Sequence, residues 1–146
     1  MKKQAYTMIA LLVLVGSMAV AAQAQTVGRT QLIANIPFQF NVGTKTLPAG
    51  EYSVRQVNPD SGGVLLLSSR DGNASVMIQV GSVIGKAQES AKLTFHRYGN
   101  KYFFAQAWID GDNTGMQAPK SKAERAAESE LAGLQSKTET VALRAR

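Results

Sequence analysis

Cysteine is absent from the 146 residues of the chain, and histidine occurs once, as His96. Without cysteine the chain has no disulfide bond, no thiolate metal ligand and no cysteine of the kind to which bacterial lipoproteins attach a lipid. A transition-metal site would have to rely on carboxylates beside this one imidazole, and no spaced set of them is visible. The stability of the folded chain must therefore come from packing.

Long hydrophobic runs are also scarce. The sequence has one, which extends from Met8 to Ala22. Lys2 and Lys3 precede this run, and the small-residue pattern Ala22-Gln23-Ala24 ends it. A basic start, an apolar stretch too short to span a bilayer comfortably and an A-x-A site are typical of a cleaved secretory signal peptide. We therefore predict a signal peptide over residues 1–24 and export to the periplasm or the external medium.

The excess of positive charge is small, with 16 Lys and Arg against 10 Asp and Glu. Loss of Lys2 and Lys3 with the signal peptide leaves 14 basic and 10 acidic residues, so the mature charge is +4. This charge is too weak to argue for nucleic acid as a partner. We expect residues 25–146 to form a single β-rich domain, with no membrane span and with an unknown partner in the envelope or outside the cell.

Alternation of apolar and polar residues predicts strands along most of the mature chain. The segment from Thr30 to Val42 has the pattern of a strand with one buried face, and it is either an edge strand or a strand start, because Pro37 cannot donate to a ladder. Unpaired edge groups template pairing, so self-association through Ile36 to Val42 is a related expectation. Further strands are predicted at Tyr52 to Val54, Val64 to Leu67 (short and fully buried), Ala74 to Val80, Lys92 to Arg97, Tyr102 to Ile109 and Thr138 to Leu143.

Two tight turns indicate antiparallel hairpins. Arg70-Asp71-Gly72-Asn73 and Arg97-Tyr98-Gly99-Asn100 each lie between apolar runs and carry a glycine that tolerates positive φ. The cluster from Asn58 to Gly63 and the polar segment from Asp110 to Pro119 are predicted to be loops.

Near the C-terminus, Ser121-Lys122-Ala123-Glu124 matches a capping box, in which the Ser and Glu side chains reciprocally satisfy free amides at a helix start. The pattern predicts a helix over about residues 121–134. The expected fold is therefore mainly β, an antiparallel sandwich or small barrel of about seven strands with one C-terminal helix.

Aromatic residues fall almost wholly in the predicted strands. In Tyr102-Phe103-Phe104 consecutive rings must point to opposite faces, so both faces of this sheet need a cover. We expect the helix to supply the second cover through Leu131 and Leu134. If the helix leaves that face open, an aromatic surface of Tyr98, Tyr102 and Trp108, or Phe104 in place of Trp108, is the candidate binding site.

Nucleophilic catalysis would need His96 as its base, and the chain has no Gly-x-Ser-x-Gly motif. Alternation places Phe95 in the core and His96 on the opposite face, with Thr94 and Tyr98, where a polar cross-strand contact is the ordinary role. No enzyme activity and no cofactor are therefore predicted.

A second candidate for chemistry is Asp110-Gly111-Asp112-Asn113-Thr114-Gly115, which approaches a calcium-binding loop. The match fails at its twelfth position, where Ser121 replaces the required Glu, and Pro119 lies inside the loop. We predict no metal site. The alternative function is a small secreted hydrolase or calcium-dependent protein that uses His96 or the loop of Asp110 and Asp112.

Three motifs have strand aromatics and turn glycines or prolines as their characteristic residues. They are Ile36-Pro37-Phe38-x-Phe40-x-Val42-Gly43, Leu47-Pro48-Ala49-Gly50-x-Tyr52-x-Val54 and Phe95-His96-Arg97-Tyr98-Gly99-x-x-Tyr102-Phe103. Together they resemble a family of small secreted bacterial proteins of unknown function. The resemblance implies export and a compact β fold, and it supplies no catalytic residues. The leading hypothesis is an exported, non-catalytic binding or structural module of the envelope or the extracellular medium.

Overall fold

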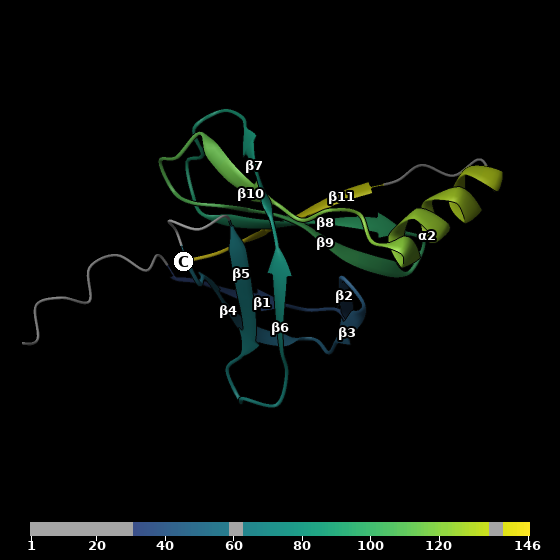
Figure 1. Cartoon of the computed structure of the whole chain (residues 1–146), viewed down its shortest axis with the longest axis horizontal. Coiled ribbons are helices and arrows are strands. Elements are labelled where there is room, and N and C mark those ends of the chain that lie inside the picture. The colour runs from purple at the N-terminus through teal and green to yellow at the C-terminus, as the bar shows by residue number, and fades with distance from the viewer. Residues whose placement is uncertain (1–30, 59–62, 135–138) are drawn as a thin grey trace, which may run out of the picture.

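Strands dominate the structure, a computed structural model that describes residues 31–58, 63–134 and 139–146 (Figure 1). This part of the chain contains eleven strands in two open sheets and one C-terminal helix. The prediction of a mainly β sandwich with a C-terminal helix is confirmed, whereas the open sheets do not form a barrel. The predicted signal peptide, residues 1–24, and residues 59–62 of the predicted loop lie outside the described residues.

The first sheet has four antiparallel strands in the order β1-β4-β5-β6. Its strands are β1 (Gln31–Ile36), β4 (Gly50–Gln56), β5 (Val64–Ser69) and β6 (Ser75–Gln79). In β5, Leu65 and Leu67 are buried while Val64 and Leu66 are half-buried. The prediction of a fully buried strand there is wrong, because only the inner face of this sheet is covered by a second layer.

The second sheet follows the order β11-β8-β9-β10-β7. Its strands are β7 (Gly81–Ile84), β8 (Lys92–Tyr98), β9 (Lys101–Trp108), β10 (Thr114–Gln117) and β11 (Glu139–Arg144). A small hairpin of β2 (Phe40–Val42) and β3 (Lys45–Leu47) joins β9 in parallel through Asn41 and Phe103. The segment predicted as a polar loop after Asp110 thus contains β10, whose four residues are too few and too polar to give an alternation signal.

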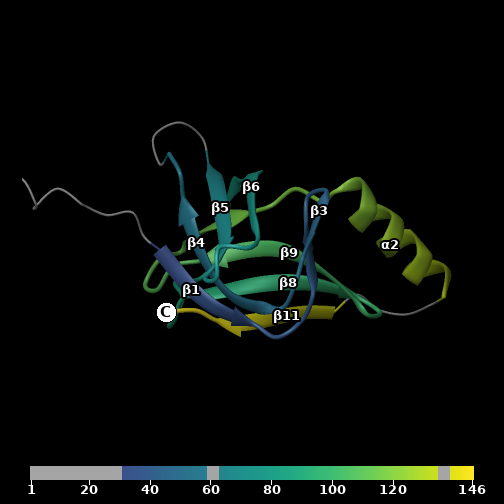
Figure 2. The same cartoon turned by 90° about the horizontal axis from the view of Figure 1, so that it is seen from below.

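The hydrophobic core lies between the two sheets, which cross as two layers (Figure 2). Phe40 is central to it: its ring lies edge-on to Tyr52 and to Phe95, with centroids 5.1 and 5.5 Å apart. Each large side chain buried in this way stabilises the fold by about 1.5–3 kcal/mol. The three aromatic residues come from β2, β4 and β8, so this contact joins both sheets.

Both predicted hairpins are confirmed. Gly72 has φ 78° between β5 and β6, and Gly99 has φ 63° between β8 and β9. A positive φ of this size strains any residue with a side chain, so glycine at these turns sets the pairing of the strands on either side.

Pro37 divides the single strand predicted from Thr30 to Val42 into β1 and β2. β1 is an edge strand, as predicted, but its outer side is partly covered: the amide of Ile33 donates to the carbonyl of Arg146 (2.9 Å), and the amide of Arg146 donates back to Ile33 (3.0 Å). β2 has β3 on one side and β9 on the other. The proposed self-association through Ile36 to Val42 therefore lacks an open edge at β2. No helix in the described ranges is both long and apolar enough to cross a membrane.

Close packing of Trp108 gives a test of the second sheet. A Cβ added at Gly115 would lie 2.7 Å from the indole of Trp108, whereas one added at Gly81 would meet nothing within 4 Å. We expect Gly115→Ala to lower the free energy of unfolding by about 1–3 kcal/mol, measured by urea denaturation. The control Gly81→Ala should change it by less than about 0.5 kcal/mol. Equal stabilities for the two variants would contradict this packing of Trp108.

Candidate functional site

The helix α2 (Lys122–Gly133) covers the second face of the sheet at the β8–β9 hairpin (Figure 1). Tyr98 and Phe103 form a small buried cluster with Ala127 of the helix, and Leu131 packs against it. The expectation that the helix supplies this cover is confirmed for Leu131. It is wrong for Leu134, which is 71% exposed because the helix ends before it.

The three aromatic residues predicted to share a binding surface lie in three environments. Tyr98 is buried under α2, and Tyr102 packs on the opposite face of the sheet, stacked on Phe38 with ring centroids 3.8 Å apart. Trp108 is buried over Gly115. Phe104, the alternative to Trp108, belongs to the main core. The helix therefore does not leave an aromatic face open, which was the condition attached to that prediction.

A buried carboxylate is the main polar feature beneath the helix. Glu124, in the first turn of α2, is 3% exposed. Its Oε1 accepts a hydrogen bond from the hydroxyl of Tyr98 (3.0 Å) and lies 2.7 Å from Nδ1 of His96. Because a carboxylate only accepts, Nδ1 of His96 carries the proton in this contact. The Glu124 cluster, which we define as Glu124, His96 and Tyr98, thus joins the helix to β8.

The capping box predicted at the start of this helix is half formed. The hydroxyl of Ser121 accepts from the amide of Glu124 (3.0 Å), as the motif requires. The Glu124 side chain turns to the sheet instead of back to the Ser121 amide. Its tertiary role was missed because a Glu three residues after an N-cap Ser is fully accounted for by local capping.

Burial and the nearby charge of Glu124 raise the pKa of Tyr98 well above its ordinary value, burial being the larger cause. The hydrogen bond to Glu124 acts in the same direction, since it needs the phenol proton. Tyr98 therefore stays a neutral donor to Glu124 throughout the physiological range.

An acid–histidine pair is also part of the hydrolase triad, in which the second imidazole nitrogen activates a hydroxyl. Within the described part of the chain, the hydrogen bond of the His96 side chain is the one to Glu124, and no Ser or Thr hydroxyl bonds to Nε2. The predicted placement of His96 as a polar residue outside the main core agrees with this contact. The Glu124 cluster holds α2 against β8.

In the Asp110–Asp112 loop, one carboxylate oxygen of Asp112 is used within the loop. Oδ1 of Asp112 accepts from the amide of Thr114 (2.9 Å), which forms a turn over these residues. Across the described ranges, no group of three or more His, Asp or Glu side chains is placed to hold a metal ion.

A different feature lies at the end of the first sheet, where β6 has a partner on one side. The amide of Val80 donates to Gly63 (2.7 Å), and the amide of Ser69 donates to Ala74 (2.8 Å). Because hydrogen-bonded and non-hydrogen-bonded pairs alternate along an antiparallel ladder, these two bonds determine which residues of β6 bond to β5. The backbone groups of Val76 and Ile78 face β5. The groups of Ser75, Met77 and Gln79 point to the outer edge, where no described strand pairs with them.

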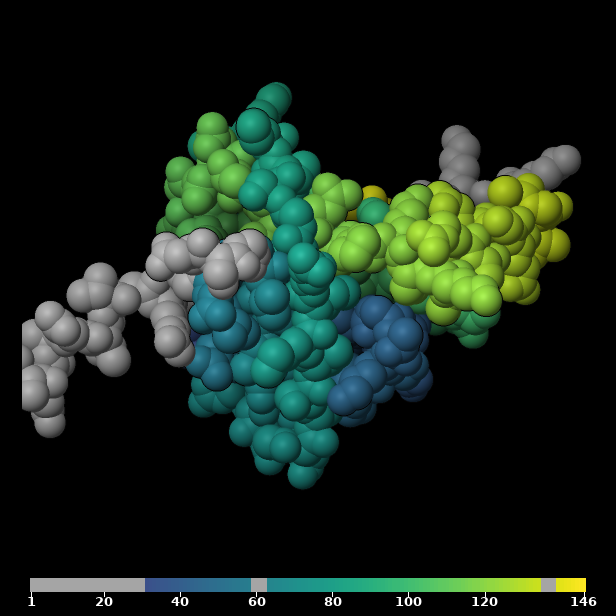
Figure 3. Space-filling model, viewed as in Figure 1, coloured from purple at the N-terminus to yellow at the C-terminus, as the bar shows by residue number. Residues whose placement is uncertain are grey.

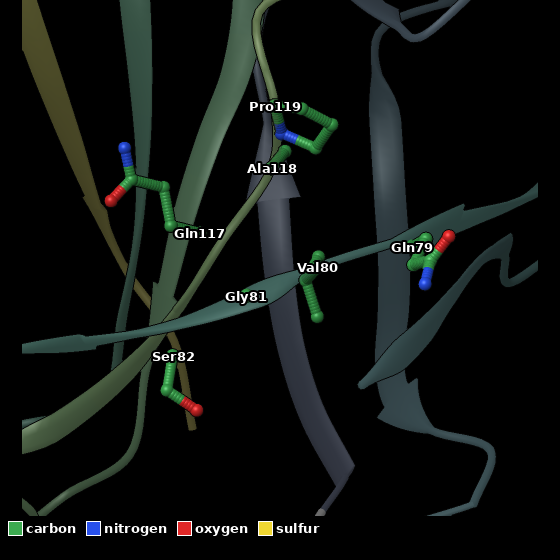
Figure 4. A pocket seen from close by; sticks show the side chains of 7 residues that line it. All are labelled: Gln79, Val80, Gly81, Ser82, Gln117, Ala118 and Pro119. Atoms are coloured by element: carbon green, nitrogen blue, oxygen red, sulfur yellow. The ribbon is translucent and has the colours of Figure 1, made fainter. Parts of the chain in front are cut away.

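A groove of about 560 Å³ follows this outer edge of β6. All five residues of β6 line one side, and residues 42–45 of the β2–β3 hairpin line the other (Figure 3). Met77 is 65% exposed in the groove. The Nζ of Lys45 donates to the carbonyl of Ser75 (3.2 Å) and occupies one end of the edge. A second, shallower cleft of about 460 Å³ continues past Gln79 to Ser82 and Gln117 (Figure 4).

Gln79 and Gln117 lie well apart in this second cleft, on either side of Val80 and Gly81 (Figure 4). The cleft therefore lacks converging polar groups. The edge of β6 is the more defined of the two surfaces, because its backbone donors and acceptors are aligned in one direction.

Comparison of the chain with protein-family models, with curated proteins and with solved structures found no match. The resemblance to small secreted bacterial proteins stays a prediction.

Removal of the Glu124 carboxylate tests its role as a fastener. In Glu124→Ala the Tyr98 hydroxyl and the His96 Nδ1 proton lose their acceptor, so we expect the free energy of unfolding to fall by about 2–4 kcal/mol. Glu130→Ala is the matched control, since Glu130 forms an exposed 3.9 Å pair with Lys101 and should cost less than about 0.5 kcal/mol. Urea denaturation measures both, and a Glu124 variant as stable as the control would refute the assignment.

The raised pKa of Tyr98 predicts a loss of stability in alkali. The unfolded chain releases this phenol proton near pH 10.0 while the folded chain keeps it, so the contribution is complete below that pH and declines above it. Tyr98→Phe should be less stable than the wild type at neutral pH, by about 1–2 kcal/mol. The gap should narrow as the pH rises above 10.0. Thermal unfolding across that range measures the gap, and a constant difference would contradict the raised pKa.

Proposed function

We propose that this chain is an exported, non-catalytic binding module that takes up an extended polypeptide segment by strand addition at β6. The observation that carries the proposal is the row of outward-facing backbone groups at Ser75, Met77 and Gln79, beside a groove. An added strand pairs with such groups by main-chain hydrogen bonds, and alternate side-chain pockets give selectivity. Support for export comes from the basic, apolar and A-x-A pattern of residues 1–24.

The contrast with other strand edges supports this choice. β1 is covered at Ile33 by Arg146, and β11 carries Glu139 and Arg144, whose charges disfavour pairing. β7 is shorter than β6 and begins with Gly81, a residue type depleted in strands. β6 reads Ser-Val-Met-Ile-Gln, with no charge, proline or glycine. Proteins usually protect edges of this composition, so one that is capped only at its Ser75 end, by Lys45, suits a binding surface.

The partner in this proposal is a polypeptide of the envelope or of the extracellular medium. A nucleic acid is disfavoured, because the groove is lined by one basic residue, Lys45, among uncharged ones. We therefore place the self-association expected of an edge strand at β6 instead of at Ile36–Val42. The non-catalytic part of the proposal is supported by the commitment of His96 to Glu124. The rival is a secreted hydrolase, which that acid–histidine pair would serve only with a nucleophile bonded to Nε2.

Proline at position 77 tests the binding edge directly. The Met77 amide faces outward, so Met77→Pro removes an edge donor and leaves the bonds from Val76 and Ile78 to β5 in place. We expect peptides selected from a random displayed library to bind the wild type and the control Met77→Thr. They should bind the proline variant at least about tenfold more weakly, a loss of about 1.4 kcal/mol. Fluorescence anisotropy measures this, and peptides that bind all three chains equally would overturn the proposal.

A further inference from the structure

The occupant of the β6 edge can be specified further, on the basis of the proposed function that this edge binds a strand. We propose that the strand is β6 of a second copy of this chain, antiparallel to the first, with the two-fold axis at Met77. The pair would continue the first sheet through β6 into the β6, β5, β4 and β1 strands of the second copy.

The outward-facing backbone groups of β6 are symmetric about one residue. The outward-facing residues, Ser75, Met77 and Gln79, are odd in number and evenly spaced about Met77. In an antiparallel pair, Met77 lies opposite Met77 of the second copy, and Ser75 lies opposite Gln79. Each opposed pair exchanges two N–H···O bonds, about six in all. A strand whose outward groups are symmetric about one residue is its own complement in this geometry.

The outer face of the sheet beside β6 is apolar. Leu66 of β5 lies directly across from Met77 and is half-buried, while Met77 is 65% exposed. In the proposed dimer the two Met77 side chains meet on this face, flanked by the two Leu66 side chains. A continuous apolar row forms where the monomer leaves an isolated methionine exposed. Burial of this row favours the dimer at about 25 cal/mol for each Å² removed from water.

The inner side of the groove also favours an apolar strand. The hairpin reaches beneath β6, where a Cβ at Gly43 would lie 3.9 Å from Cδ1 of Ile78. The inward side chains of an added strand would thus lie beside the hairpin, near Val42 and Gly43. β6 of a second copy has Val76 and Ile78 on this face, where they also pack against its own core, so its inward side is apolar, whereas a charged segment would lose hydration.

Charge does not oppose pairing between two β6 strands. β6 has no charged residue, so the two copies meet without like charges across the strand pair. Lys45 bonds to the Ser75 carbonyl at one end. That oxygen has a second lone pair for the Gln79 amide of the second copy. A five-residue edge is smaller than a standard interface, which points to a dissociation constant in the micromolar range, on the order of 10 μM or weaker.

The absence of cysteine makes a register-specific test possible. In the proposed pair the Cα atoms of Met77 and Met77 of the second copy are about 5.5 Å apart, within the range that a disulfide bridges. Met77→Cys should therefore give a covalent dimer under mild oxidation. Ser75→Cys alone and Gln79→Cys alone should not, because each cysteine lies several residues from its own copy. A mixture of these two variants should give the cross-linked heterodimer.

Sedimentation of the wild type over a concentration series provides the second readout. We expect reversible dimerisation that Met77→Pro abolishes and Met77→Thr weakens without abolishing, because threonine keeps the edge amide but loses the apolar contact of Met77. A wild type that stays monomeric at several hundred micromolar, or equal cross-linking by Ser75→Cys and Met77→Cys, would overturn the dimer. The peptide-binding experiment is independent: peptides that bind the wild type and not Met77→Pro would leave strand addition standing after the dimer had failed.

Discussion

Backbone hydrogen bonding at the edges of two open sheets is the constraint on which the rest of this structure depends. Every edge strand presents amides and carbonyls that must pair, be covered or remain in water. The C-terminal residues pair with β1 through Arg146, and the β2–β3 hairpin adds to β9 beside Phe103. Among the described strands, β6 is an edge that leaves most of this capacity unused along a groove.

The Glu124 cluster settles a different question, namely which surface is available for contact. By accepting from Tyr98 and His96, the buried carboxylate holds α2 over Tyr98 and Phe103. The rings of Tyr98 and Phe103 thereby become interior. A buried charge costs several kcal/mol unless its hydrogen bonds are made, so the cluster favours one position of the helix over others. The proposed contact surface is therefore an edge, made of backbone groups, instead of an aromatic face.

Local signals in the sequence predicted much of this fold. The glycines of Arg70-Asp71-Gly72-Asn73 and of Arg97-Tyr98-Gly99-Asn100 marked both hairpins, since positive φ is a property of the turn itself. Ser121 marked the start of the helix, because N-capping also depends on neighbouring residues alone. Short strands such as β3 and β10 were not predicted, because three or four residues are too few to show an alternation of apolar and polar residues.

The candidate site was less accessible, because it depends on contacts between distant residues. Tyr98 and Tyr102 are four residues apart but lie on opposite faces, since a turn and a change of strand separate them. Near the register shift between Thr94 and Phe95, three consecutive residues (Leu93, Thr94 and Phe95) are buried, which simple alternation does not predict. That β6 ends its sheet follows from strand order, which long-range pairing decides.

Amide hydrogen exchange of the dilute monomer, followed by NMR, tests the central claim most directly. We expect exchange rates to alternate within this one short strand: slow at Val76 and Ile78, whose amides face β5, and fast at Met77 and Gln79, whose amides face the groove. Uniformly slow exchange along β6 in the monomer would contradict it, because the outer edge would then already be paired.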